Sequence, residues 1–161
     1  MTYVTITEIE AETGVLSGNM AISGGIVRAT GSSGMARYAF QAPQAGEYQI
    51  KGLVDGPSPS ANSFYFGIDT DPAGTQIWDI YPPTVGFQWR AGNWRGTGTE
   101  EVPQFNPKVF TLTAGPHTLI LRARETGAGI DRIQILQNQF SWQQVGSSIT
   151  LTLDQLPPAA P

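Results

Sequence analysis

The chain of 161 residues contains no cysteine, which excludes disulfides, zinc–thiolate sites and thiol nucleophiles. Charged residues make up only 14% of it, and with a net charge of -4 it offers no basic patch for nucleic acid or an anionic membrane. No apolar run approaches the roughly 18 residues needed to span a bilayer, and no leader pattern opens the chain. We therefore expect a mature, soluble protein with neither nucleic acid nor a membrane as its partner.

Glycine and proline are abundant where charge is scarce. The chain has 19 glycines and 12 prolines, a balance typical of many short strands joined by tight turns. No sharp break in composition divides it, so we expect a single all-β domain over residues 1–155. The Pro-rich residues 156–161 are interpreted as a linker stub that joins this domain to a larger parent protein.

Apolar and polar residues alternate with period two in several runs, the pattern of half-buried strands. Clusters of Gly, Pro, Asn and Asp separate these runs and predict turns. Residues 78–107 form the one long stretch without such alternation and are rich in Trp, Gly and Pro. We expect an irregular loop there that carries ligand. The alternating runs fall within residues 38–40, 48–54, 64–68, 119–123, 133–135 and 149–153.

Glu8, Glu10 and Glu12 are spaced by two, which on a strand places three carboxylates on one face. Their mutual repulsion calls for positive charge nearby. A calcium ion, which collects six to eight oxygen ligands, would supply it. On spacing alone, a solvated face with arginine partners is the preferred interpretation. Candidate partners are Arg28, Arg37, Arg122, Arg124 and Arg132.

Five short motifs follow one another along the chain. They are Glu10-Ala11-Glu12, PQAGEY at 43–48, NSFYFGID at 62–69, FTLTAGPHTL at 110–119 and RETGAGIDRI at 124–133. Each motif is weak alone, but their order and spacing over roughly residues 8 to 138 resemble the family 6 and family 35 carbohydrate-binding modules.

This resemblance implies a β-sandwich jelly roll of two antiparallel sheets. It also implies a structural calcium ion held by Glu10, Glu12 and Asp131 together with backbone carbonyls. One carbonyl is expected in the turn at residues 28–31, where the sequence departs from the family pattern. Such an ion would tie the first strand to the last.

Sugar recognition needs an aromatic face for the apolar side of a pyranose and polar groups for its hydroxyls. Trp94 lies between Gly92-Asn93 and Arg95-Gly96 without apolar neighbours, so we expect it to be exposed at a loop. Trp78 is expected in the core. The predicted sugar-binding residues are Trp94, Trp89, Arg90, Asn93, Arg95 and Asn138.

Two of these assignments keep an alternative. Trp89 resembles a tryptophan that either lines the cleft or packs beneath it in the family. Asn138 follows the last strand, where related modules present a sugar-binding Asn, but it could equally be an ordinary turn residue. The lone His117 is expected to make structural hydrogen bonds rather than to catalyse.

These patterns together predict a secreted, monomeric, non-catalytic module that holds polysaccharide for a covalently linked catalytic or surface domain. Cysteine-free modules of this kind are frequent in bacterial extracellular proteins. One alternative is a structural or adhesive sandwich without sugar binding. Another is a glycoside hydrolase or lyase domain with two carboxylates as acid and base. An exposed Trp94 would favour binding, and a buried one would favour the spacer.

Overall fold

The fold is known from a computed structural model that describes residues 2–95, 105–139, 142–145 and 148–151, with side chains up to residue 139. The backbone of these residues forms strands and one short 3₁₀-helix. They are β1 (Tyr3–Glu10), η1 (Ala11–Thr13), β2 (Val15–Ser17), β3 (Met20–Ser23), β4 (Ile26–Ala29), β5 (Met35–Ala42), β6 (Gly46–Asp55), β7 (Ser63–Ile68), β8 (Ile77–Asp79), β9 (Gln88–Ala91), β10 (Phe110–Leu112), β11 (Gly115–Ala123), β12 (Gly129–Asn138), β13 (Trp142–Val145) and β14 (Ser148–Leu151).

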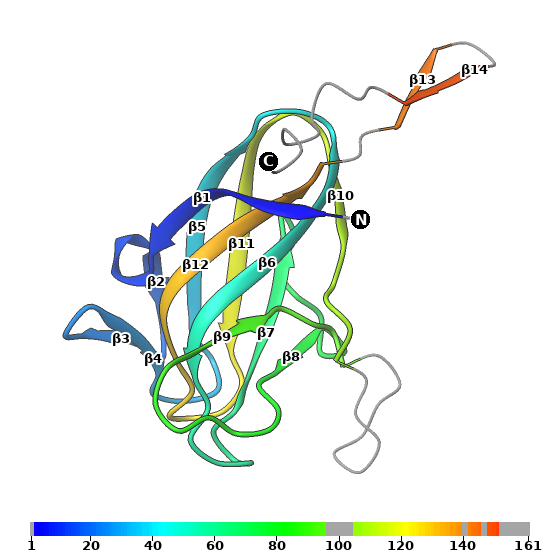
Figure 1. Ribbon diagram of the computed structural model, residues 1–161. Helices are drawn as coiled ribbons and strands as arrows, with labels where there is room; N and C mark the ends of the chain where they lie inside the picture. Colours follow the sequence, from blue (N-terminus) through cyan, green and yellow to red (C-terminus); the bar gives the residue numbers. More distant parts are fainter. Residues whose placement is uncertain (1, 96–104, 140–141, 146–147, 152–161) are drawn as a thin grey trace, which may run out of the picture.

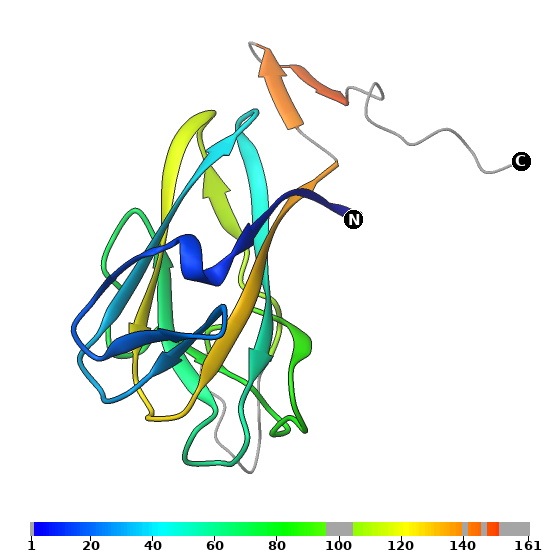
Figure 2. The same cartoon turned by 90° about the vertical axis from the view of Figure 1, so that its left-hand side faces the viewer.

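Two antiparallel sheets pack face to face, which confirms the predicted all-β sandwich (Figures 1 and 2). The seven-stranded sheet has the order β10-β6-β12-β4-β3, with β1 also paired to β12 and β9 also paired to β6. The five-stranded sheet has the order β2-β5-β11-β7-β8. No helix in the described residues is long and apolar enough to cross a membrane.

The alternation read from the sequence sets which side of each strand is buried. In β6, Tyr48, Ile50 and Val54 are fully buried, while Lys51 between them is exposed. The inward side chains of both sheets form one core, and each large one stabilises the fold by roughly 1.5–3 kcal/mol. Trp78 and Tyr38 belong to this core, as the sequence predicts.

The first strand, β1, pairs with most of the long strand β12, which comes late in the chain. β12 has β6 along one side, while β4 and then β1 share the other. Glu10 lies opposite Arg132 in this pairing. The two distant parts of the chain are therefore joined by backbone hydrogen bonds, whatever else links them.

Two expectations about local structure are wrong. Residues 78–107 are not one irregular loop, because Ile77–Asp79 and Gln88–Ala91 are strands, each paired with a neighbour. Glu12 does not continue the row of Glu8 and Glu10, because β1 ends at Glu10 and η1 turns the chain. The predicted stub 156–161 lies outside the described residues, and β13 and β14 pair only with each other.

His117 links the turn after β7 to the β10–β11 hairpin through hydrogen bonds. Its Nδ1 lies 2.6 Å from Asp69 Oδ2, and its Nε2 lies 2.8 Å from the carbonyl oxygen of Thr113. Because a carboxylate and a carbonyl can only accept hydrogen bonds, these two contacts favour the positively charged imidazole, in which both ring nitrogens donate. Asp69 also accepts from the Thr118 N–H at 2.8 Å. The structural role predicted for His117 thus agrees with its contacts.

The pairing of His117 with Asp69 makes the unfolding free energy depend on pH in a defined direction. The hydrogen bond to Asp69 and that to Thr113 raise the pKa of His117 against the opposing effect of burial. Burial works to raise the pKa of Asp69, but hydrogen bonds from His117 and Thr118 outweigh it and lower that pKa. The contribution of His117 to the unfolding free energy is complete below about pH 6.5 and is lost as the pH rises through its raised pKa. The contribution of Asp69 to the unfolding free energy is lost only in acid, as the pH falls through its lowered pKa.

We therefore expect the unfolding free energies of the wild type and His117→Gln to differ most near pH 5–6 and to converge by about pH 9. Urea unfolding at intervals of one pH unit measures the difference. The difference between the wild type and Asp69→Asn should narrow over the same range without vanishing, because Asp69 still accepts from the Thr118 N–H at high pH. A difference that stays constant from pH 5 to 9 would show that His117 is neutral in the fold.

Candidate functional site

The segment from β8 to β9 passes from one sheet to the other. β8 pairs with β7 in the five-stranded sheet, whereas β9 pairs with β6 in the seven-stranded sheet. The connection at residues 80–87 therefore runs across one end of the sandwich (Figure 1). Side chains from this segment form a surface that belongs to neither sheet alone.

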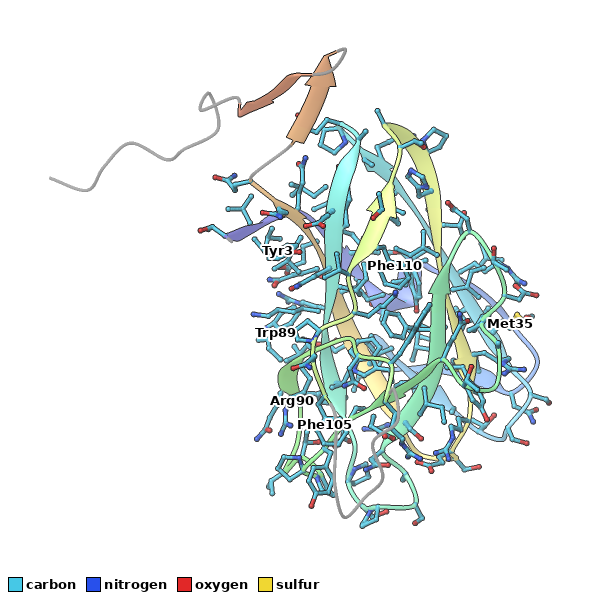
Figure 3. The ribbon with its side chains drawn as sticks, turned by 90° about the vertical axis from the view of Figure 1, so that its right-hand side faces the viewer. Tyr3, Met35, Trp89, Arg90, Phe105 and Phe110 are labelled. Atoms are coloured by element: carbon cyan, nitrogen blue, oxygen red, sulfur yellow. The ribbon has the colours of Figure 1, made fainter. Side chains whose placement is uncertain are left out.

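Aromatic side chains are exposed on this segment. Tyr81 is 41% exposed and Trp89 is 39% exposed, and no other aromatic side chain in the described residues is as exposed. Tyr81 stacks on Phe105, with ring centroids 5.2 Å apart and planes 25° apart. Figure 3 shows Trp89, Arg90 and Phe105 on the same side of the molecule. Trp89 is thus in the more exposed of the two positions that the sequence allowed.

A small pocket of about 150 Å³ opens beside this aromatic pair. Arg90 reaches into its wall and donates to the carbonyl oxygen of Tyr81 at 3.0 Å and to Gln88 Oε1 at 2.7 Å. Both acceptors are neutral, so within the described residues the charge of Arg90 is not compensated by a carboxylate. The pocket is lined by Asp79, Tyr81, Arg90, Ala91, Asn93 and Phe105.

Beneath the pocket, Asp79, Asn93 and Arg95 form a polar frame. The Asn93 amide accepts from the Asp79 N–H at 3.2 Å and donates to the Asp79 carbonyl oxygen at 2.9 Å. Arg95 donates hydrogen bonds from Nε and Nη2 to the two oxygens of the Asp79 carboxylate. Asn93 is 3% exposed and Asp79 is 6% exposed, so both side chains hold the pocket in shape. Of the predicted residues, Asn93 and Arg90 therefore line the same pocket, and Arg95 supports it.

The prediction that Trp94 is exposed is wrong. Its side chain is half-buried and packs edge-on against Phe66 and Phe110. Its indole Nε1 donates to the carbonyl oxygen of Phe66 at 2.9 Å. These partners lie far from it in the sequence, so the polar neighbours of Trp94 in the chain gave no sign of them.

Asn138 lies away from this surface. It is buried and donates to Glu47 Oε2 at 2.8 Å, beside the start of β6. Trp89 pairs with Leu53 near the other end of β6. At about 3.3 Å per residue, the two positions are roughly 20 Å apart along the strand. Asn138 therefore cannot contribute to the same pocket as Arg90.

Tyr81 and Phe105 are site residues that the sequence reasoning missed. Tyr81 precedes two prolines, which hold the chain extended outside a regular strand. An aromatic residue in such a connection has no alternating pattern to bury it, and this was the available signal. Phe105 carried no such signal, because its contact with Tyr81 spans 24 positions of sequence.

The predicted calcium ligands are not gathered around one point. Among the described residues, no three acidic or histidine side chains are placed to hold a metal ion together. Glu8 and Glu10 instead meet Arg132, with closest approaches of 3.3 Å in both cases. These two carboxylates follow the alternative of a solvated face with an arginine partner. Asp131 lies next to Arg132 on β12 and is half-buried.

Glu12 differs from the other two glutamates. Its Oε2 is buried without a hydrogen-bond partner in the described part of the chain, and so is the Tyr38 hydroxyl. Burial raises the pKa of Tyr38, and the negative charge of Glu12 raises it further. A buried, unpaired carboxylate oxygen is costly. An added cation would relieve this cost. The buried Glu12 carboxylate therefore fits a calcium ligand, although the described residues do not gather Glu10 and Asp131 around it as a three-ligand group.

Asn93 offers a test of the frame beneath the pocket. Asn93→Ala removes both hydrogen bonds to the Asp79 backbone and leaves a buried N–H and C=O unsatisfied. We expect a loss of about 2–3 kcal/mol in unfolding free energy, measured by urea denaturation. Gln88→Ala, which removes an exposed partner of Arg90, should cost less than about 0.5 kcal/mol. Equal stability of both variants would show that Asn93 has no structural role.

Comparison with known proteins gives a structural match alone. No protein-family model matches the chain, and no curated protein matches its sequence. A family 35 carbohydrate-binding module from Clostridium thermocellum superimposes with a TM-score of 0.52 at 16% identity, over 84% of this chain and 98% of that one. The GH26-CBM35 β-(1,4)-mannanase of Podospora anserina gives 0.57 at 13% identity, over 81% of this chain and 27% of that one.

An isomalto-dextranase from Arthrobacter globiformis gives a TM-score of 0.55 at 13% identity, over 80% of this chain and 23% of the enzyme. The chain thus spans about a quarter of each enzyme but nearly all of the separate module. Identities this low establish the fold only. The protein has the β-sandwich fold of the family 35 carbohydrate-binding module, as its ordered motifs predict.

Proposed function

We propose that this chain is a non-catalytic module that binds polysaccharide through Tyr81, Trp89, Arg90 and Phe105. The observation that carries the proposal is the exposed Tyr81, stacked on Phe105 beside an uncompensated guanidinium group at a pocket, with Trp89 exposed on the adjoining strand β9. Aromatic faces bind the apolar side of a pyranose ring, and Arg90 and Asn93 supply hydrogen-bonding groups for its hydroxyls. The fold shared with carbohydrate-binding modules supports this assignment.

A hydrolase or lyase is less consistent with the chemistry of the pocket. Glycoside hydrolysis uses two carboxylates on opposite sides of the scissile bond. The pocket presents one described carboxylate, that of Asp79, and Arg95 binds both of its oxygens. Asp79 is thereby held as a structural anion rather than as a group that exchanges protons with substrate.

A spacer without a ligand is the remaining alternative, and Trp94 does not exclude it because Trp94 is half-buried. Tyr81 and Trp89 favour binding instead. Exposing large aromatic side chains on one short segment has no benefit for a spacer, whereas such groups mark interaction surfaces.

The wider role we propose is passive. The module would raise the local concentration of a covalently linked catalytic or surface domain at its polysaccharide, outside the cell. Its fold is found beside the catalytic parts of the mannanase described above, which supports this arrangement. We propose that the module acts as a monomer.

We also propose a structural calcium ion bound by Glu12, Asp131 and backbone carbonyls, with Glu10 completing its ligands by exchanging its partner Arg132 for the ion. The buried, unpartnered Glu12 Oε2 supports this proposal. The pairing of Glu10 with Arg132 brings Glu10 beside the strand that carries Asp131. When bound, the ion would supply positive charge that offsets the burial of Glu12.

The binding proposal predicts the effect of truncating its aromatic groups. In affinity gel electrophoresis against a panel of plant and algal polysaccharides, at least one should retard the wild type. Tyr81→Ala and Trp89→Ala should each weaken that retardation about 10-fold, because they remove the stacking surface. Val15→Ala, at a position 73% exposed on β2, should have no effect. Retardation that is absent, or indifferent to both aromatic variants, would favour the spacer.

The calcium proposal predicts that a chelator lowers the melting temperature by about 5 °C or more in a thermal scan. Asp131→Ala should melt at the chelated temperature without any further decrease on chelation. Glu8→Gln should remain sensitive to chelator, because Glu8 pairs with Arg132 and Gln134 instead. A wild-type melting temperature that does not change with chelator contradicts the ion.

A further inference from the structure

A second, larger hollow lies on the other side of the segment that carries the pocket. Its volume is about 310 Å³, near the lower end of the range for small-molecule sites. Residues of β7 line one wall and Phe110 of β10 lines another, so both sheets contribute; Figure 3 shows Phe110 between them. None of its lining residues lines the pocket at Arg90. The lining residues are Gly67, Ile68, Thr70, Gln76, Trp94 and Phe110.

Lys108 lies over the aromatic wall of this hollow. Its Nζ is 4.1 Å from the centre of the Trp94 ring and 5.5 Å from that of Phe110. The aromatic faces attract the ammonium group but do not neutralise it. No carboxylate in the described residues pairs with Lys108, whereas five of the arginines have one. Lys108 does not itself line the hollow, but its ammonium group lies over two rings that do, and no carboxylate in the described residues neutralises it.

The remaining lining consists of Gly67, Ile68 and two polar but uncharged residues, Thr70 and Gln76. Gln76 Oε1 accepts from the Ala73 N–H at 2.8 Å, which fixes the carboxamide and leaves its NH₂ group to donate elsewhere. Thr70 adds a hydroxyl group. The nearby carboxylates are engaged away from the hollow, because Asp69 binds His117 and Asp71 binds Arg37. An anion in the hollow would thus meet donors and a cation.

We propose that this hollow is a saccharide subsite selective for a pyranose with an anionic substituent, either a carboxylate or a sulfate ester. The anion pairs with Lys108, which moves from the indole face to the ligand. The C–H side of the ring then contacts the Trp94 and Phe110 ring faces that Lys108 covered. Gln76 and Thr70 bond its hydroxyls. The inference rests on the proposed function, to which it adds a second subsite and a ligand class.

The test is a titration of the full chain followed by the Trp94 indole N–H signal in NMR spectra, assigned with Trp94→Phe. The probes are methyl β-D-glucuronide, D-glucose 6-sulfate and the neutral methyl β-D-glucoside. We expect at least one anionic probe to bind at least 10-fold more tightly than the neutral one at low salt. The tighter of the two identifies carboxylate or sulfate as the group recognised.

Variants of the two lysines separate a specific site from general attraction. Lys108→Met keeps the length of the side chain and should reduce anionic binding to the level of the neutral probe, while Lys108→Arg should retain it. Lys51→Met makes the same charge change at the chain's other lysine, exposed on β6, and should have no effect. Equal binding of neutral and anionic probes, an unaffected Lys108→Met, or an equal loss in Lys51→Met overturns the proposal.

These outcomes are independent of the pocket at Arg90. Polysaccharide retardation that depends on Tyr81 and Trp89 can persist when anionic selectivity at Lys108 fails, which would refute the subsite alone. Conversely, loss of all retardation with intact Lys108-dependent probe binding would refute the Tyr81 surface and leave the subsite in place.

Discussion

The burial of Trp78 between the two sheets is the contact on which the candidate site depends. Its indole is fully buried and packs against Phe66, with ring centroids 5.2 Å apart. It reaches the opposite sheet at Gly52, where an added Cβ would lie 2.6 Å from the indole ring. Glycine at 52 therefore makes room for the ring. Because Trp78 is held by both sheets, Asp79 and Tyr81, which follow it, have a fixed starting point at the end of the sandwich.

Because Trp78 fixes this part of the chain, the residues that pack beside it after β9 can line both the pocket at Arg90 and the hollow at Trp94. Asn93, two residues after the end of β9, binds the backbone of Asp79 through its side chain. The hydrogen bonds of Trp94 and Arg95 to β7 and β8 hold the next two residues. Successive side chains of an extended segment point to opposite sides. Asn93 therefore faces the pocket beside Arg90, while Trp94 faces the hollow under Lys108. One rigid segment thus forms a wall of both.

The sequence predicts the fold well because strand burial is a local pattern. Tyr48, Ile50 and Val54 alternate with outward residues, and the ordered motifs identify which sandwich they build. The site is harder to predict, because its side chains are decided by partners far away. The sequence predicts an exposed Trp94, but Phe66 and Phe110, distant in the chain, pack against it. The spacing of the glutamates predicts Glu12 on the strand face, because no residue nearby indicates the 3₁₀ turn. Asn138 lies about 20 Å along β6 from the residues with which the sequence predicts it to act.

Charge distribution gives these two hollows their chemical character. Of the nine basic residues, Arg28, Arg37, Arg95, Arg124 and Arg132 are bound to carboxylates. Of the four without a carboxylate partner among the described residues, Arg122 stacks on Tyr65 and Lys51 is exposed on a sheet face. The other two, Arg90 and Lys108, each lie beside aromatic rings at a hollow. In a chain with a net charge of -4, positive charge left uncompensated at both hollows attracts anionic ligands that the rest of the surface repels. Recognition of acidic glycans is therefore more consistent with this arrangement than recognition of neutral glycans alone.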